Sequence, residues 1–136
     1  MKRILCLILS LTLLMLAATP VLAAENENTV TPRYTYIGRI YSGLTINSLG
    51  LSACNANGYS PTAASVKLTC RLQRYNGSSW ATVKTWTATG TDYAAVSKNY
   101  AVAKGYTYRL NASFSVYNAS GTLLESGTCN SNQVVY

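Results

Sequence analysis

The chain of 136 residues has no histidine, and its only acidic residues are Glu25, Glu27, Asp92 and Glu125. Without histidine, neither the Ser-His and Cys-His pairs of nucleophilic catalysis nor the common histidine metal clusters can form. A glycosidase-like pair would need two acids about 5–10 Å apart in one cleft, and no pattern brings Asp92 and Glu125 together. A Ser-Lys pair is chemically open, but no motif indicates one. We therefore predict no enzyme activity, no catalytic residues, no cofactor and no metal site.

Charged residues are also scarce, at 11% of the chain, and no run of Lys or Arg occurs. The net charge is +7, so the protein should drift towards anionic surfaces. The sparse charge favours a solvated, mildly basic surface over a dedicated anion site. No nucleic-acid partner is predicted.

The chain has a single long apolar run, residues 4–16, which two basic residues precede. At 13 residues it is too short to cross the ~30 Å hydrocarbon core as a helix. Small residues follow it, as is typical of a secretory signal peptide. We predict a signal peptide over residues 1–23, cleaved after Ala23 or Ala24. The mature chain then has no transmembrane anchor and is secreted, either extracellular or loosely held at the cell surface.

Removal of the signal peptide leaves 113 residues, the size of one domain, and lowers the net charge to +5 because Lys2 and Arg3 are lost. Residues 24–33 are polar and have no periodicity, which predicts a flexible leader. Residues 34–136 are expected to form one β-sandwich domain.

Residues 102–117 carry the clearest strand pattern, because apolar and polar residues alternate from residue 108 onwards. Six further strands, separated by Gly, Asn, Ser and Pro turn signals, are predicted over residues 36–46, 51–57, 64–75, 80–88, 93–102 and 122–136. Glycines in the first of these predict an edge strand with a bulge or kink. Seven strands with turns every 8 to 12 residues or so predict an all-β, seven-stranded antiparallel immunoglobulin-like sandwich.

The corner ahead of the strand at residue 108 has an apolar residue, a Gly and a Tyr at Val102, Gly105 and Tyr108. This spacing resembles the corner before the sixth strand of fibronectin type III domains. The resemblance implies that the Tyr108 ring packs in the core and that its hydroxyl bonds a nearby backbone group. The chain departs from that pattern at Lys104, where those domains usually have Pro.

A broader resemblance covers residues 72–86, residues 102–110 and a last strand with Glu125 and Tyr136. These segments are similar to a family of small secreted proteins of Gram-positive bacteria, a domain of unknown function with an immunoglobulin-like β-sandwich. The resemblance implies the fold and a secreted bacterial origin, and it implies no activity.

Three cysteines remain after signal cleavage: Cys54, Cys70 and Cys129. In an oxidising compartment they allow one disulfide and one free thiol, and the spacing leaves all three pairings open. They can also be buried small hydrophobic residues. Cys70 fits that alternative, because it shares an apolar face with neighbouring Val and Leu residues.

Lys67, Arg71 and Arg109 occupy outward positions of strands that we expect to be neighbours in one sheet. With Gln73 they would form a mildly basic face, and the alternative is an ordinary solvated sheet face. The chain also has 11 Tyr and two Trp, which are good strand formers. Trp86 and Tyr108 are expected in the core, and exposure is expected at four residues in tails, loops or strand ends: Tyr34, Tyr36, Tyr59 and Tyr75.

These features predict a secreted, non-catalytic binding or adhesion module whose ligand is a cell-wall polymer, a glycan or a protein. The alternative is a secreted effector, such as a toxin, an inhibitor or an antagonist of neighbouring cells. A self-assembling extracellular subunit, formed through a disulfide dimer or strand addition, is a further alternative.

Overall fold

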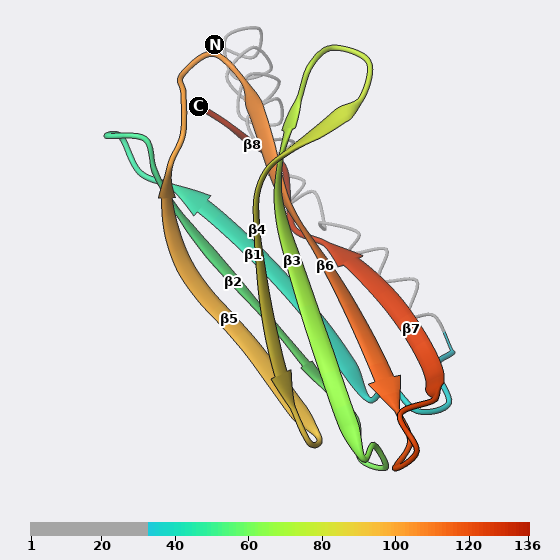
Figure 1. Ribbon diagram of the computed structural model, residues 1–136. Coiled ribbons are helices and arrows are strands. Elements are labelled where there is room, and N and C mark those ends of the chain that lie inside the picture. Colours follow the sequence, from blue (N-terminus) through green and yellow to red (C-terminus); the bar gives the residue numbers. More distant parts are fainter. Residues whose placement is uncertain (1–32) are drawn as a thin grey trace, which may run out of the picture. The chain divides into compact units, whose positions relative to one another are not determined.

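The computed structural model describes residues 33–136, which form an open arrangement of two antiparallel β-sheets (Figure 1). This confirms the predicted all-β, sandwich-like fold. The predicted signal peptide, residues 1–23, and the leader, residues 24–33, lie outside the described residues apart from Arg33.

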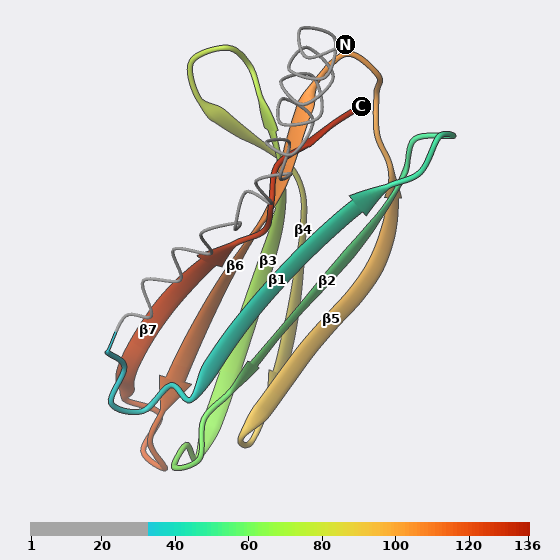
Figure 2. The same cartoon turned by 180° about the vertical axis from the view of Figure 1, so that it is seen from behind.

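The first sheet has three strands in the order β1-β2-β5, and the second has β4-β3-β6-β7 with the short β8 paired to β6 (Figure 2). The strands are β1 (Arg39–Ile46), β2 (Leu51–Tyr59), β3 (Ser65–Tyr75), β4 (Trp80–Gly90), β5 (Tyr93–Ala101), β6 (Thr107–Tyr117), β7 (Leu123–Asn130) and β8 (Val134–Val135).

Strand β6 lies in the interior of the five-stranded sheet, between β3 on one side and β7 and β8 on the other. Its inward side chains are at most 1% exposed, and they are Tyr108, Leu110, Ala112, Phe114 and Val116. Burying a Leu, Phe or Val side chain contributes about 1.5–3 kcal/mol. This strand therefore supplies the centre of the core.

The last predicted strand, residues 122–136, is in fact two strands, β7 and β8. Ser131 separates them by replacing strand pairing with its own hydrogen bonds. Its backbone N–H donates to the Leu110 carbonyl, and its hydroxyl accepts from the Leu110 N–H, both at 2.8 Å. The chain then turns so that β8 pairs with the start of β6 at Thr107 and Tyr108.

A bulge or kink was predicted in the first strand, and the bulge is absent. β1 is an edge strand, but it pairs with β2 without a register shift. Gly43 instead leaves room for the Tyr41 ring, since a Cβ there would lie 2.5 Å from the Tyr41 hydroxyl oxygen. The register shifts occur at Leu72/Gln73 opposite β4 and at Val116/Tyr117 opposite β7.

Three edge strands carry a charged residue whose register partner is buried. The pairs are Lys84–Leu72 in β4 and β3, Lys98–Cys54 in β5 and β2, and Glu125–Val116 in β7 and β6. Because these strands lie at sheet edges, the long Lys84 and Lys98 side chains can reach water from such positions, and both are exposed. The shorter Glu125 side chain instead accepts hydrogen bonds from backbone N–H groups of residues 35–37.

Strand β2 presents only small residues to the core: Ser52, Cys54, Ala56 and Gly58. At Gly58 the Phe114 ring of the opposite sheet occupies the space of a side chain, because a Cβ there would lie 2.2 Å from the nearest ring carbon. The two sheets can therefore approach closely along β2.

Replacing Gly58 with Ala should destabilise the fold by about 1–3 kcal/mol, because the added methyl would overlap a buried ring that cannot move aside. Gly43→Ala is the matched control, since it meets the free end of the exposed Tyr41 ring. Denaturant unfolding of both variants measures the difference. Equal costs for the two substitutions would contradict the account of Gly58.

Candidate binding face

The strand register places Lys67, Arg71 and Arg109 on the same face of the five-stranded sheet. Lys67 and Arg71 lie four residues apart on β3, and Arg109 of β6 pairs with Gln73 of β3, two residues beyond Arg71. Since side chains alternate along a strand, these positions all point away from the core. The structure thus brings the three predicted basic residues together on one surface.

Hydroxyl and amide side chains fill the rest of this surface. We define the outer polar face as the three basic residues and Gln73 together with Thr69 of β3, Thr82, Thr85, Thr87 and Thr89 of β4, Asn111, Ser113 and Ser115 of β6, and Ser126, Thr128 and Asn130 of β7. The described residues include two acids, Asp92 and Glu125, and neither belongs to this face. The face therefore combines positive charge with many neutral hydrogen-bonding groups.

An aromatic cluster lies at one end of the outer polar face, where the β3–β4 hairpin projects from the sheets (Figure 1). The Tyr75 and Trp80 rings pack with centroids 5.3 Å apart. The guanidinium carbon of Arg109 lies 4.2 Å from the Trp80 centroid, and its Nε donates to Gln73 Oε1 at 2.9 Å. A cation over an aromatic ring is favourable, so Trp80 and Gln73 hold the Arg109 side chain in place.

Glu125 holds the start of the fold against β7. Its carboxylate accepts hydrogen bonds from the backbone N–H groups of Thr35, Tyr36 and Ile37 at 3.0, 2.7 and 2.8 Å. Desolvation disfavours the charged form, but the three donors outweigh it, so the pKa of Glu125 lies below its ordinary value. Glu125 is thus a structural residue.

Replacing Glu125 with Gln should lower the melting temperature at pH 7, and this difference should shrink as the pH falls. The folded pKa is depressed, so the carboxylate stabilises the fold above the ordinary value of about 4.3 and loses its effect as the pH falls through the folded value. Melting curves from pH 2 to 8 measure this. Asp92→Asn is the control, because within residues 33–136 its carboxylate accepts a hydrogen bond only from the neighbouring Thr91 hydroxyl, at 3.4 Å. A pH-independent deficit in Glu125→Gln would contradict the role.

The corner residues Val102 and Gly105 lie between β5 and β6, and Tyr108 is the second residue of β6. The Tyr108 ring is 1% exposed, and its hydroxyl donates to the Ala103 carbonyl at 2.8 Å. Burial raises the pKa of this hydroxyl, which keeps it a donor. Gly105 has a φ of 90°, a conformation that glycine adopts without strain, and the Val102 N–H donates to the Gly50 carbonyl at 2.8 Å.

Tyr108→Phe should cost about 1 kcal/mol, because the Ala103 carbonyl would lose its partner. Tyr106→Phe is the matched control, since that ring packs edge-on against Tyr108 but is 40% exposed. Thermal unfolding of both variants measures the cost. An unchanged melting curve for Tyr108→Phe would remove the assignment of the corner.

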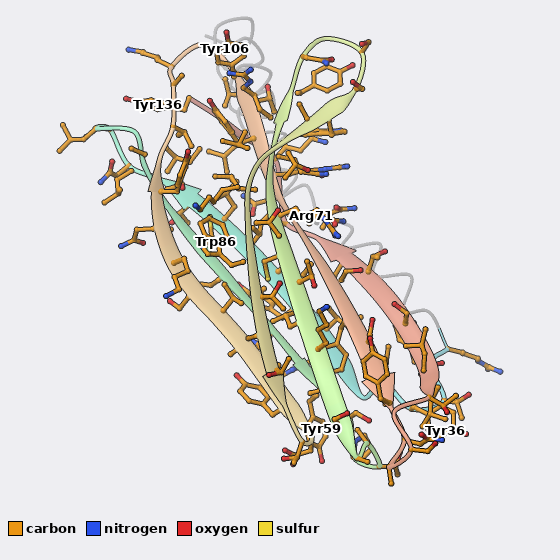
Figure 3. The ribbon with its side chains drawn as sticks, viewed as in Figure 1. Tyr36, Tyr59, Arg71, Trp86, Tyr106 and Tyr136 are labelled. Carbon is orange, nitrogen blue, oxygen red and sulfur yellow. The ribbon has the colours of Figure 1, made fainter. Side chains whose placement is uncertain are left out.

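The predicted tyrosine exposures are only half right. Tyr59 and Tyr75 are exposed, whereas Tyr34 and Tyr36 pack partly buried against the core. Figure 3 labels Tyr36 and Tyr59 on separate parts of the same end of the sandwich. Three exposed tyrosines were missed: Tyr41, Tyr93 and Tyr106. The exposure of Tyr41 could have been predicted from the sequence. Side chains alternate along a strand, and Tyr41 lies between Ile40 and Ser42, which point inward.

Trp86, expected in the core, is partly buried on β4 between the sheets (Figure 3). Its ring packs edge-on against Tyr100 of β5 at a centroid distance of 6.3 Å. The two rings fill the space between the edge strands of opposite sheets.

Cys54 and Cys70 are buried, Cys129 is partly exposed, and none of the three forms a disulfide in the structure. Within residues 33–136 no cluster of three or more metal-ligating side chains occurs. No helix in this described part is long and apolar enough to span a membrane.

No protein-family model matches the chain, and no curated protein matches it either.

Proposed function

We propose that this protein is a secreted, non-catalytic binding module that holds an anionic cell-wall polymer on its outer polar face. The observation that carries the proposal is the gathering of Lys67, Arg71 and Arg109 on one sheet face that has no acidic residue. The described part has nine basic and two acidic residues, so its net positive charge attracts polyanions, and three of the basic residues lie on this face.

The form of the face suits an extended polymer. Threonine, serine and asparagine side chains from four neighbouring strands can hydrogen-bond sugar or phosphate oxygens along its length. The Trp80 ring at one end offers an apolar surface beside the Arg109 cation. Many weak contacts of this kind favour a repeating chain over a small molecule.

We also propose the finer fold assignment, an immunoglobulin-like sandwich related to fibronectin type III domains and to secreted Gram-positive proteins. The strand order, with three strands facing β4-β3-β6-β7, supports it. So does the Tyr108 hydrogen bond ahead of the sixth strand. Secretion rests on the predicted signal peptide, residues 1–23.

The non-catalytic assignment is supported by the positions of the two acids. Glu125 is engaged by three backbone donors, and Asp92 lies in the turn between β4 and β5. Neither is placed to exchange protons with a ligand on the outer polar face.

Binding to purified Gram-positive cell walls tests the proposal. The exported protein should be retained at about 50 mM salt and released at about 500 mM, because salt screens contacts between exposed charges. The Lys67→Gln/Arg71→Gln variant should bind about three- to tenfold more weakly, as expected for two exposed ionic contacts. Arg109 is left unchanged because it also packs on Trp80.

The matched control is Arg39→Gln/Lys98→Gln, which removes the same charge from the three-stranded sheet. It should bind almost as well as the unaltered protein. Equal losses in both double variants would mean that net charge, and not this face, governs retention. No retention at low salt would overturn the wall-binding proposal.

A self-assembling subunit is the second candidate function. It is favoured by Cys129, a partly exposed thiol on the edge strand β7. An intermolecular disulfide through Cys129 would give a dimer on non-reducing gels. A monomer in size-exclusion chromatography without reductant would argue against it.

A further inference from the structure

Strand β1 has a strand partner on one side only. It is an edge of the three-stranded sheet, and among residues 33–136 it pairs only with β2 (Figure 2). The pairing has no register shift, so the edge is regular over the full length of the strand. Within the same residues, no backbone hydrogen bond from a turn or loop occupies the free side. A regular unpaired edge can accept another strand.

The direction of the backbone groups along β1 follows from its pairing with β2. The Asn47 N–H donates to the Leu51 carbonyl at 3.1 Å, one step beyond the last pair of the ladder. Along an antiparallel ladder, hydrogen-bonded pairs alternate with non-hydrogen-bonded pairs. The odd-numbered residues of β1 therefore bond β2, and the even-numbered residues turn their N–H and C=O groups to the free side. The even-numbered residues are Ile40, Ser42, Leu44 and Ile46.

The even-numbered residues of β1 are also the ones that point inward. Ser42 and Leu44 are buried, and Ile40 and Ile46 are partly buried against the core. None of them carries a charge. A strand added at this edge would continue the core if its own inward residues are uncharged, because no charge would then lose its contact with water.

A second copy of β1 meets these requirements. When two β1 strands pair antiparallel about a two-fold axis at Gly43, Ile40 faces Ile46 of the second copy, and Ser42 faces its Leu44. Every N–H and C=O on the free side of β1 then has a partner. An axis at Ser42 or Leu44 would leave an end residue of the strand unmatched, and a one-residue slip would place inward residues opposite outward ones.

The outward residues of β1 also match in this register. Tyr41 faces Thr45 of the second copy, and aromatic and β-branched residues on neighbouring strands stabilise a sheet. Tyr41 is 51% exposed, more than any other tyrosine of residues 33–136. The two Gly43 residues meet at the axis, where the ends of the Tyr41 rings have room. Arg39, the only charged residue of β1, faces Asn47, so no like charges meet.

We propose that this protein forms a symmetric dimer in which β1 pairs with β1 of a second copy. The pairing joins the two three-stranded sheets into one continuous sheet. The proposal rests on the second candidate function, self-assembly, and identifies its partner and its surface. It is independent of wall binding and needs no disulfide.

Size-exclusion chromatography with light scattering tests the dimer. The exported protein at about 100 µM, which suits a weak interface, should be a dimer with and without dithiothreitol. A monomer in both conditions would overturn self-assembly altogether. A dimer that dithiothreitol converts to a monomer is linked through a disulfide, and it would overturn the strand pairing while self-assembly stands.

Ile46→Lys tests the β1 edge, because it places a charge at an inward position that the second copy covers. The dimer should weaken by at least about tenfold, since burial of an unpaired charge is costly. The matched control is Asn99→Lys, which adds the same charge at an exposed outward position of β5 and should leave the dimer intact. Equal effects of the two substitutions would overturn the assignment to β1, and melting curves show that both variants fold.

Disulfide trapping tests the register and needs no core substitution. Gly43→Cys and Thr45→Cys are each made in the Cys129→Ser protein and treated with oxidised glutathione. Cα atoms of a non-hydrogen-bonded pair lie about 4.5 Å apart, within disulfide range, so the two Gly43→Cys positions should link. The new side chain at Gly43 displaces only the free end of the exposed Tyr41 ring.

Thr45→Cys is the control for trapping, because Thr45 faces Tyr41 of the second copy. The two Thr45 positions are then about 13 Å apart along the strands, beyond disulfide range, and should not link. A Gly43→Cys protein that stays monomeric on non-reducing gels, or equal linking of both variants, would contradict the proposed pairing.

Discussion

The close approach of the two sheets along β2 is the constraint on which the rest of the structure depends. Gly58 has no side chain, so the Phe114 ring of β6 lies directly against the backbone of the opposite sheet. The other inward residues of β2 are also small. Because protein interiors are densely packed, this contact determines how far apart the two sheets lie at Gly58.

Much of this fold could be predicted from local pattern, and the reason is visible in β6. Its inward and outward residues differ sharply in polarity, so alternation identifies both the strand and its buried face. In β2 the inward residues are small and the outward ones include Leu51 and Tyr59, so the pattern shows a strand without showing which side is inward. Glycines in strands were equally ambiguous, since Gly43 accommodates a ring where we expected a bulge.

The candidate site was predictable only in part. Parity placed Lys67, Arg71 and Arg109 outward on strands expected to be neighbours, and the register that pairs Arg109 with Gln73 came only from the structure. The stacking of Arg109 on Trp80 depends on how β4 pairs with β3. That pairing changes register between Leu72 and Gln73, which the residue pattern does not indicate. The role of Glu125 had no sequence signal, because the amides it binds lie about 90 residues away. Such long-range partners follow from topology, which residue patterns do not specify.

The charges at core-facing positions of the edge strands have a consequence for solubility. An unpaired strand edge can recruit another chain, and an inward-pointing charge there discourages it because the added strand would bury that charge. Lys84, Lys98 and Glu125 occupy such positions on β4, β5 and β7. Among the edge strands of residues 33–136, the inward positions of β1 carry no charge, so this edge lacks that barrier to pairing with another chain.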